Sequence, residues 1–203
     1  YEVANRENVI RFLCFDQEYP NSILSCLIAA RENARSVREI IPAEMWEHVN
    51  TFYHSIREAS RQHDVMEFPH DFFNHIVKES YTFVGMSIAI MTHDEGWHFC
   101  RAGRMLERAD KTSRILDVKY FYLLPSVNEV GSVLDNVQWS ALLQSASGLQ
   151  GYRQKHGAIH LANVVEYLLL DREFPRSVRY CVERVFDSLH CISGTPLGSY
   201  ANE

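Results

Sequence analysis

The chain has 203 residues, a hydrophobic fraction of 46%, a charged fraction of 23% and a formal net charge of -6 at pH 7. This balance excludes an intrinsically disordered chain, and the acidic net charge excludes the general basic surface of a nucleic-acid-binding protein. The longest uncharged apolar stretch, residues 81–92, is shorter than the ~18 residues that a transmembrane helix needs. We therefore expect no nucleic-acid partner and no membrane partner.

Segments of helical periodicity follow one another along the chain, and the six prolines fall between them. Proline is tolerated in linkers and in the first turn of a helix, but not in a helix interior. We therefore predict an all-α fold, a helical bundle of about eight helices that forms a single domain over residues 1–203. The predicted helices are 3–15, 20–40, 43–62, 69–92, 94–123, 133–155, 158–170 and 175–191.

Apolar and small residues recur three and four positions apart in the helix predicted over 94–123. This spacing predicts a narrow seam at which a second helix approaches closely. The predicted seam residues are Phe99, Ala102, Leu106, Ala109, Ser113, Leu116, Tyr120 and Leu123.

Residues 8–27 match residues 163–182 at an offset of 155 positions, and 8 of the 20 positions are identical. The match predicts an internal duplication, in which one helix–turn–helix unit is used twice and the copies are related by a pseudo-twofold. At this offset, the counterparts of residues 103–117 and 30–42 fall outside the chain. We therefore expect the chain to be truncated at both ends.

The turn of the repeated unit carries the same residue types in both copies. Pro20 and Pro175 are expected at the start of the following helix, and the hydroxyls of Ser22 and Ser177 are expected to reach free backbone amides there. This structural interpretation explains the residue types, although a carboxylate and a serine in one turn also leave a ligand site open.

Five cysteines occur without a Cys-x-x-Cys pair, most of them inside apolar helical runs. This usage predicts reduced, buried thiols in a cytoplasmic protein, with neither disulfides nor a zinc site. Cys26 and Cys181, which occupy equivalent places in the duplication, are expected to be core thiols.

The densest charge pattern lies on the helix predicted over 94–123, where acidic and basic residues flank the seam. Either these charges form ion pairs on an exposed face, or they are partly buried at a helix contact and hold a functional surface. Under the second interpretation, Glu107 is mostly buried and bonds at least one arginine. The candidate arginines are Arg31, Arg35, Arg104, Arg108 and Arg114.

Four stretches, in order along the chain, resemble the bacterial alpha-E family, an all-helical family named for its Glu-Arg motif. The first is residues 30–39, with Trp46 and Asn50 downstream, and the second is residues 103–117, which carry the Glu-Arg signature. The third is Leu124-Pro-Ser with Gly131, Asp135 and Trp139, and the fourth is residues 174–181. Together they cover nearly the whole chain.

The resemblance implies a set of site residues and a set of partners. Alpha-E proteins occur fused to, or encoded beside, circularly permuted ATP-grasp enzymes and transglutaminase-like proteins, so an ATP-grasp-type ligase, a transglutaminase-like protein or an anionic peptide is the expected partner. The implied site residues are Glu107 and Arg108, with Arg104, Asp110 and Arg114 around them, and Arg31, Glu32, Asn33, Arg35 and Arg38 on the second helix.

Other chemistry has weaker support. Glu95 and His98 have the Glu-x-x-His spacing of di-metal helical bundles, but Gly96 interrupts the motif near a helix start, so we expect no metal and no cofactor. The sequence has no Gly-x-Ser-x-Gly elbow and no glycine-rich phosphate loop. Two hypotheses remain: an adaptor that docks a ligase or presents its anionic peptide substrate, and an enzyme of amide or peptide chemistry that uses Glu107 and neighbouring arginines.

Overall fold

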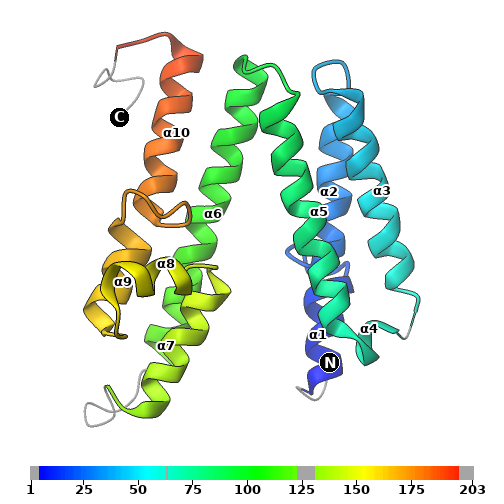
Figure 1. Cartoon of the computed structure of the whole chain (residues 1–203). Coiled ribbons are helices and arrows are strands. Elements are labelled where there is room, and N and C mark those ends of the chain that lie inside the picture. The colour runs from blue at the N-terminus through cyan, green and yellow to red at the C-terminus, as the bar shows by residue number, and fades with distance from the viewer. Residues whose placement is uncertain (1–4, 63, 123–130, 197–203) are drawn as a thin grey trace. The chain divides into compact units, whose positions relative to one another are not determined.

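The structure, a computed structural model, describes residues 5–62, 64–122 and 131–196, and these residues form ten helices and no strand (Figure 1). The predicted all-α class is therefore confirmed. The chain divides into two compact units, Tyr1–His93 and Asp94–Glu203. The first unit contains α1 (Arg6–Phe15), α2 (Ile23–Ser36), α3 (Ala43–Ala59), α4 (Asp64–Glu67) and α5 (Pro69–Ala89). The second contains α6 (Glu95–Tyr122), α7 (Val133–Ser145), α8 (Leu149–His156), α9 (Leu161–Leu170) and α10 (Val178–Ser193).

Two differences raise the number of helices from the predicted eight to ten. The helix predicted over 133–155 is wrong as a single element, because the chain breaks between α7 and α8. At this break Ser147 has a φ of 55°, in the left-handed region, which ends a helix. The short α4 precedes α5 and was not predicted. Each of the other predicted ranges contains one helix.

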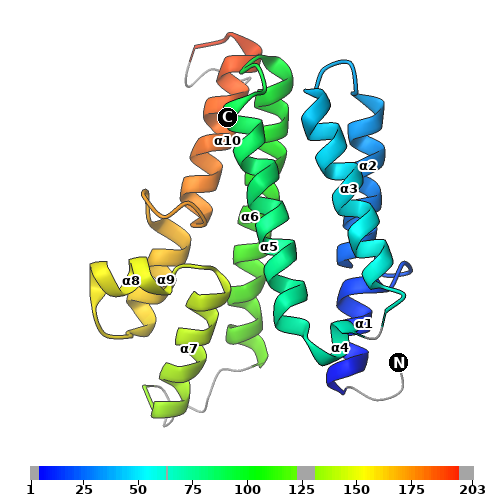
Figure 2. The same ribbon diagram turned by 45° about the vertical axis from the view of Figure 1, so that its right-hand side comes forward.

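The first unit is built on α3, which packs against α2 on one side and against α5 on another (Figure 2). Its core contains Cys14 from α1, Leu24 and Leu27 from α2, and Phe52 and Ile56 from α3. These residues recur at helical spacing, so the core side of each helix follows from its sequence.

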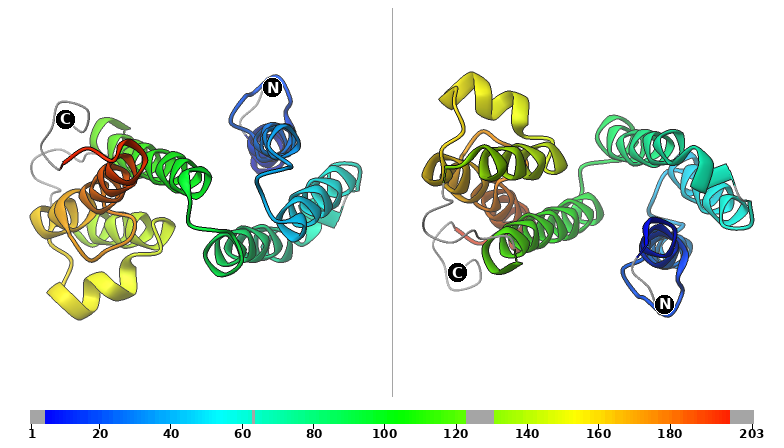
Figure 3. Two further views of the ribbon diagram at one scale, coloured as in Figure 1. Left: turned by 90° about the horizontal axis from the view of Figure 1, so that it is seen from above. Right: turned by 90° about the horizontal axis from the view of Figure 1, so that it is seen from below.

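The second unit is dominated by the contact between α6 and α10, which lie side by side in the end-on views of Figure 3. Ala102 and Met105 of α6 pack against Cys181 and Val185 of α10. A second core joins α7, α8 and α9; it contains Trp139, Leu142, Leu143, Ala146, Tyr152, Val164, Tyr167, Leu168 and Phe174. None of the described helices combines the length and apolar character needed to cross a membrane.

The predicted seam of α6 is confirmed in part: Ala102 is buried, and Ala109 and Leu116 pack against the two cores of this unit, but three positions are wrong. Phe99, Leu106 and Tyr120 are exposed, whereas Met105 and Thr112, which were not assigned to the seam, are buried. The contact with α10 uses the face that carries Ala102, Met105 and Thr112, where the small Ala102 and Thr112 allow a close approach. Leu123, the last predicted seam residue, lies outside the described residues.

The two repeated turns make corresponding hydrogen bonds. Ser22 and Ser177 are the N-caps of α2 and α10 and accept the amides of Ser25 (3.1 Å) and Tyr180 (3.0 Å), as predicted for these hydroxyls. Just before them, Asp16 Oδ1 accepts the amide of Glu18 (2.9 Å), and Asp171 Oδ1 accepts that of Glu173 (2.8 Å). The local turn thus recurs, while the duplication and its pseudo-twofold stay predictions.

Two expectations about the repeated unit are wrong. Pro20 and Pro175 lie three residues before the helices begin, because the serines and not the prolines start α2 and α10. The five cysteines form no disulfide; Cys181 is buried as predicted, but Cys26 and Cys191 are exposed, so Cys26 is not a core thiol in this structure.

Candidate functional site

A cluster of arginine and aromatic side chains joins α2 to α3. Arg31 Nε donates to Asn50 Oδ1 at 2.8 Å, and its guanidinium carbon lies 5.7 Å from the ring centroid of Trp46 and 5.1 Å from that of Tyr53. Arg38 stacks on Trp46, with its guanidinium carbon 5.2 Å from the centroid. Trp46 therefore orients two guanidinium groups through cation–π contacts.

The outer part of this cluster is open to solvent. Glu32 pairs with Arg31 at 3.1 Å and with Arg35 at 3.3 Å, and the Arg35 side chain is 67% exposed. Asn33 is exposed, and its main-chain carbonyl accepts the Ser36 hydroxyl. We call Arg31, Glu32, Arg35, Arg38, Trp46, Asn50 and Tyr53 the α2 arginine cluster. The structure thus brings four of the five residues predicted on the second helix into one polar cluster, with Arg38 in the turn after α2, and leaves Asn33 outside it.

The cluster can bind carboxylates or phosphates. A guanidinium group is planar and donates two parallel hydrogen bonds to such a group, and stacking on an aromatic ring holds its plane before a ligand arrives. Glu32 competes for the same donors, but its contacts lie on the exposed side of the helix, where an ion pair contributes little.

The predicted site residues of α6 have a different role. Arg108 Nη1 donates to the carbonyl of Pro175 at 3.1 Å, and the buried hydroxyl of Thr112 donates to the carbonyl of Arg176 at 2.8 Å. Both carbonyls belong to the turn before α10. The arginine of the Glu-Arg motif thus holds a structural turn, and Thr112 does so too, although no sequence signal had singled it out.

Glu107 is not buried, so that prediction is wrong. Its side chain is 65% exposed and forms an ion pair with Lys111 at 3.0 Å, one turn further along the helix. Each residue advances about 100° around an α-helix, which places Glu107 about 200° from the buried Met105. The contact with α10 therefore turns the glutamate towards solvent.

The remaining predicted site residues of α6 are Arg104, Asp110 and Arg114. Asp110 accepts Arg114 Nε at 2.8 Å, and this hydrogen bond lowers the pKa of Asp110. Arg104 is partly buried, and its burial lowers the pKa of its guanidinium group. The α2 and α6 sets lie in different units of the chain.

Three residues of the third alpha-E-like stretch meet in one buried contact. Asp135 accepts the Lys119 ammonium at 2.7 Å through Oδ1 and the amide of Gly131 at 2.9 Å through Oδ2, and Lys119 lies over the ring of Trp139. Burial raises the pKa of Asp135, but the hydrogen bonds from Lys119 and Gly131 outweigh it, so the net pKa is lowered. This contact was missed because Lys119 carries no sequence signal of burial. The Leu124-Pro-Ser part of the stretch lies outside the described residues.

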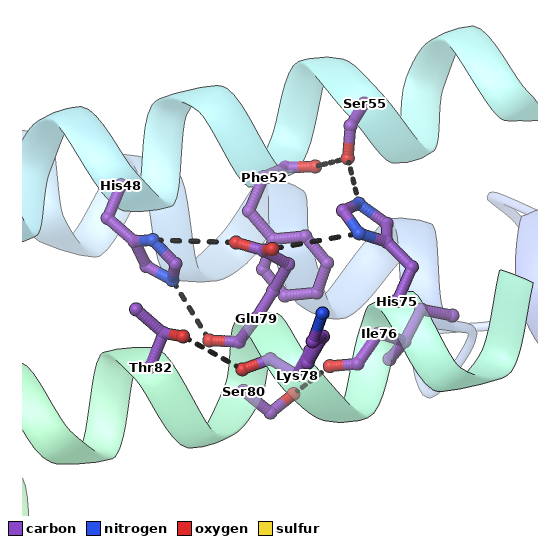
Figure 4. Close-up of polar contacts among 9 residues, drawn as sticks. All are labelled: His48, Phe52, Ser55, His75, Ile76, Lys78, Glu79, Ser80 and Thr82. Atoms are coloured by element: carbon purple, nitrogen blue, oxygen red, sulfur yellow. Dashed lines mark hydrogen bonds and ion pairs between the residues drawn. The ribbon is translucent and has the colours of Figure 1, made fainter. Parts of the chain in front are cut away.

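A second polar cluster joins α3 to α5 (Figure 4). The carboxylate of Glu79 lies 3.6 Å from Nδ1 of both His48 and His75, and His75 Nε2 lies 3.1 Å from the hydroxyl of Ser55. The serine–histidine–carboxylate order resembles a catalytic triad, but Ser55 lies inside α3, where backbone amides are bonded within the helix and are not free to stabilise an oxyanion. We therefore assign the cluster a packing role.

A surface cavity of about 440 Å³ lies beside the turn between α9 and α10. Lys155 lines this cavity and pairs with Asp171 at 2.6 Å and with Glu173 at 3.6 Å. The cavity wall mixes both signs of charge, because Glu166, Arg172 and Arg179 also line it. In the part of the chain that the structure describes, no group of three or more His, Cys, Asp or Glu side chains is placed to hold a metal ion.

Together, the fold and these sites define an all-helical protein in which most motif residues hold helices together and one arginine cluster faces solvent. The chain matches the model of the Alpha-E family, described as a predicted alpha-helical domain with a conserved ER motif, over residues 1–203, so it belongs to that family. No curated protein and no solved structure matches it.

Proposed function

We propose that this chain is a helical adaptor that binds an anionic segment of a partner protein through the α2 arginine cluster. The observation that carries the proposal is the stacking of Arg31 and Arg38 on Trp46, with the exposed Arg35 beside them. Oriented guanidinium groups at a solvent-facing position suit carboxylate-rich or phosphorylated ligands.

The alternative, an enzyme of amide or peptide chemistry, has less support. A carboxylate that acts as a general acid or base usually needs an environment that shifts its pKa, such as burial or a nearby like charge. Glu107 is instead exposed and paired with Lys111, and its neighbour Arg108 is bonded to the Pro175 carbonyl.

The partner class comes from the family. The family resemblance implies a partnership with ATP-grasp-type ligases or transglutaminase-like proteins, so the ligand that we expect is such a ligase or the anionic peptide on which it acts. Such enzymes handle carboxylates, and a carboxylate is the group that the arginine cluster would hold.

The test is binding to an ATP-grasp-type ligase of the class that the family resemblance implies, followed by ligase turnover with and without this chain. We expect Arg35→Ala and Arg38→Ala to weaken binding about tenfold or more each, because a hydrogen bond to a charged group contributes roughly 1.5–3 kcal/mol. Arg38→Lys should fail to restore binding, because lysine keeps the charge but loses the planar fork.

The matched control is Arg61→Ala, which removes the same charge from an exposed arginine of the same unit outside the cluster. It should leave binding unchanged. Equal binding by all variants would reject the α2 arginine cluster as the site. ATP-independent turnover by this chain alone, abolished by Glu107→Gln, would favour the enzyme.

A further inference from the structure

The two copies of the repeated unit bury different faces of their second helix. Cys181 and Val185 of α10 are buried against α6. Their counterparts at the offset of 155 are Cys26 and Ala30 of α2, and both are exposed. Because the caps and turns of the two copies make corresponding hydrogen bonds, the difference comes from what covers each helix and not from the local fold.

The first helices of the two copies of the repeat, α1 and α9, differ in the same way. Val164 and Leu168 of α9 are fully buried in the core that joins α7, α8 and α9, and Ile115 and Leu116 of α6 pack against this core. The identical residues of α1, Val9 and Leu13, are 45% and 47% exposed. The same apolar pattern thus forms a core in one copy and is exposed to water in the other. Exposure of such a surface to water is unfavourable, and burial against another surface would remove that cost.

The cover of α10 shows what fits this kind of surface. Ala102 and Met105 of α6 fill the space over Cys181 and Val185, and Arg108 and Thr112 donate to the carbonyls of the turn. The corresponding carbonyls in the first copy are those of Pro20 and Asn21. A helix placed over α2 as α6 is placed over α10 would meet a cysteine and two turn carbonyls at the corresponding positions, with Ala30 in place of Val185.

We propose that the face of α1 and α2 that carries Val9, Leu13, Cys26 and Ala30 is a docking site for an amphipathic polypeptide helix with the residue pattern of α6. The pattern is Ala, Met, Arg and Thr at relative positions 0, 3, 6 and 10. The alanine and methionine lie against Cys26 and Ala30. The arginine and the threonine donate hydrogen bonds to the main-chain carbonyls of Pro20 and Asn21 in the turn before α2.

The polar groups favour this occupant over a second copy of the same face. Two such faces would bring the turn carbonyls of one chain against those of the other, so acceptors would meet acceptors. An α6-type helix brings donors at the spacing that the turn requires, as Arg108 and Thr112 do for Pro175 and Arg176.

The probe is a synthetic peptide of residues 101–120, which contains the α6 pattern and no cysteine. It is added to the full chain, and the alkylation rate of each thiol is measured by mass spectrometry. Cys26 should react about tenfold more slowly at a peptide concentration of ten times Kd, because only the unoccupied fraction reacts. The exposed Cys191 should not change and serves as the internal reference. A peptide that carries Met105→Asp should not protect Cys26.

Neighbouring alanines supply matched variants of the protein. Ala30→Glu places a charge where the counterpart Val185 is buried, whereas Ala29→Glu places it where the counterpart Arg184 already reaches solvent. Both alanines are exposed, so neither change should disturb the fold. We expect Ala30→Glu to abolish protection of Cys26 and Ala29→Glu to retain it.

Three outcomes would overturn the proposal. They are an unchanged rate at Cys26 with saturating peptide, an equal effect of the two alanine variants, and faster reaction of Cys181, which would place the peptide at α10 instead. A fourth outcome is protection of Cys26 in the absence of peptide that increases with protein concentration. This result would assign the face to a second copy of the chain and would also reject the α6-type helix.

Discussion

Lys119 and Asp135 form a buried ion pair between α6 and α7, with Nζ and Oδ1 2.7 Å apart and the two side chains 1% and 5% exposed. The ammonium also donates to Gln138 Oε1 at 2.7 Å. A buried pair adds little net stability over an apolar contact of the same shape, but losing one partner leaves an uncompensated charge. We therefore expect a single substitution in this ion pair to reduce the free energy of unfolding more than a substitution elsewhere in the second unit.

Asp135→Ala should destabilise the fold by about 3–5 kcal/mol, because it leaves the Lys119 ammonium buried without its counter-charge. Urea denaturation followed by circular dichroism measures the loss. Asp110→Ala is the control, since it removes the same group from an exposed ion pair with Arg114 and should cost less than about 1 kcal/mol. Equal losses in the two variants would contradict the assignment.

The free energy of unfolding should decrease as the pH is lowered below about 4. Burial raises the pKa of Asp135 and of Asp171, but hydrogen bonds outweigh it, from Lys119 and the Gly131 amide in one case and from Lys155 and the Glu173 and Phe174 amides in the other. Both folded-state pKa values therefore lie below the ordinary 3.8, and the unfolded chain binds more protons in this range. The contribution of these two carboxylates to the free energy of unfolding is therefore fully present above the unfolded-state pKa and is lost as the pH falls through the folded-state pKa.

The measurement is urea unfolding at a series of pH values below about 6. Asp171→Asn should flatten the acid slope, because the group that binds the proton is gone. A wild-type curve with no acid slope would refute the prediction.

The two residues of the Glu-Arg motif should respond differently to truncation. Glu107→Ala removes an exposed ion pair and should change stability by less than about 0.5 kcal/mol. Arg108→Ala leaves the Pro175 carbonyl without its guanidinium donor and should cost about 1.5 kcal/mol. Thermal unfolding of both variants in the same buffer measures the two losses of stability, and the loss should be larger for Arg108→Ala. A larger loss for Glu107→Ala would restore the interpretation of a buried glutamate.

Two glycines should respond with opposite signs to alanine. A Cβ at Gly148 would lie 2.8 Å from Cζ of Phe174, a buried ring that stacks on Tyr167, so Gly148→Ala should cost about 1–3 kcal/mol. A Cβ at Gly103 meets nothing within 4 Å inside α6, so Gly103→Ala should stabilise by about 0.5–1 kcal/mol. Chemical denaturation of the two variants gives both signs, and a destabilised Gly103→Ala would point to a contact at this position that the structure does not contain.

Features that depend on neighbours in the chain could be predicted from the sequence. The helical segments follow from apolar spacing and proline positions, and Ser22 and Ser177 are capping residues because a hydroxyl three positions before an amide reaches it without help from the rest of the fold. The break at Ser147 was missed because its left-handed backbone belongs to a residue type that rarely adopts it.

The tertiary structure decided which faces these helices bury. The sequence of α6 offers apolar residues on two sides, Phe99 and Leu106 on one and Met105 on the other, and only packing against α10 selects the second. The same selection turns Glu107 to solvent and commits Arg108 to a turn 67 residues away. Lys119 is buried because Asp135 and Gln138 approach it from another helix. Periodicity is a local property of the chain, whereas burial requires a partner surface that is distant in sequence, so identical residues such as Leu13 and Leu168 end in opposite environments.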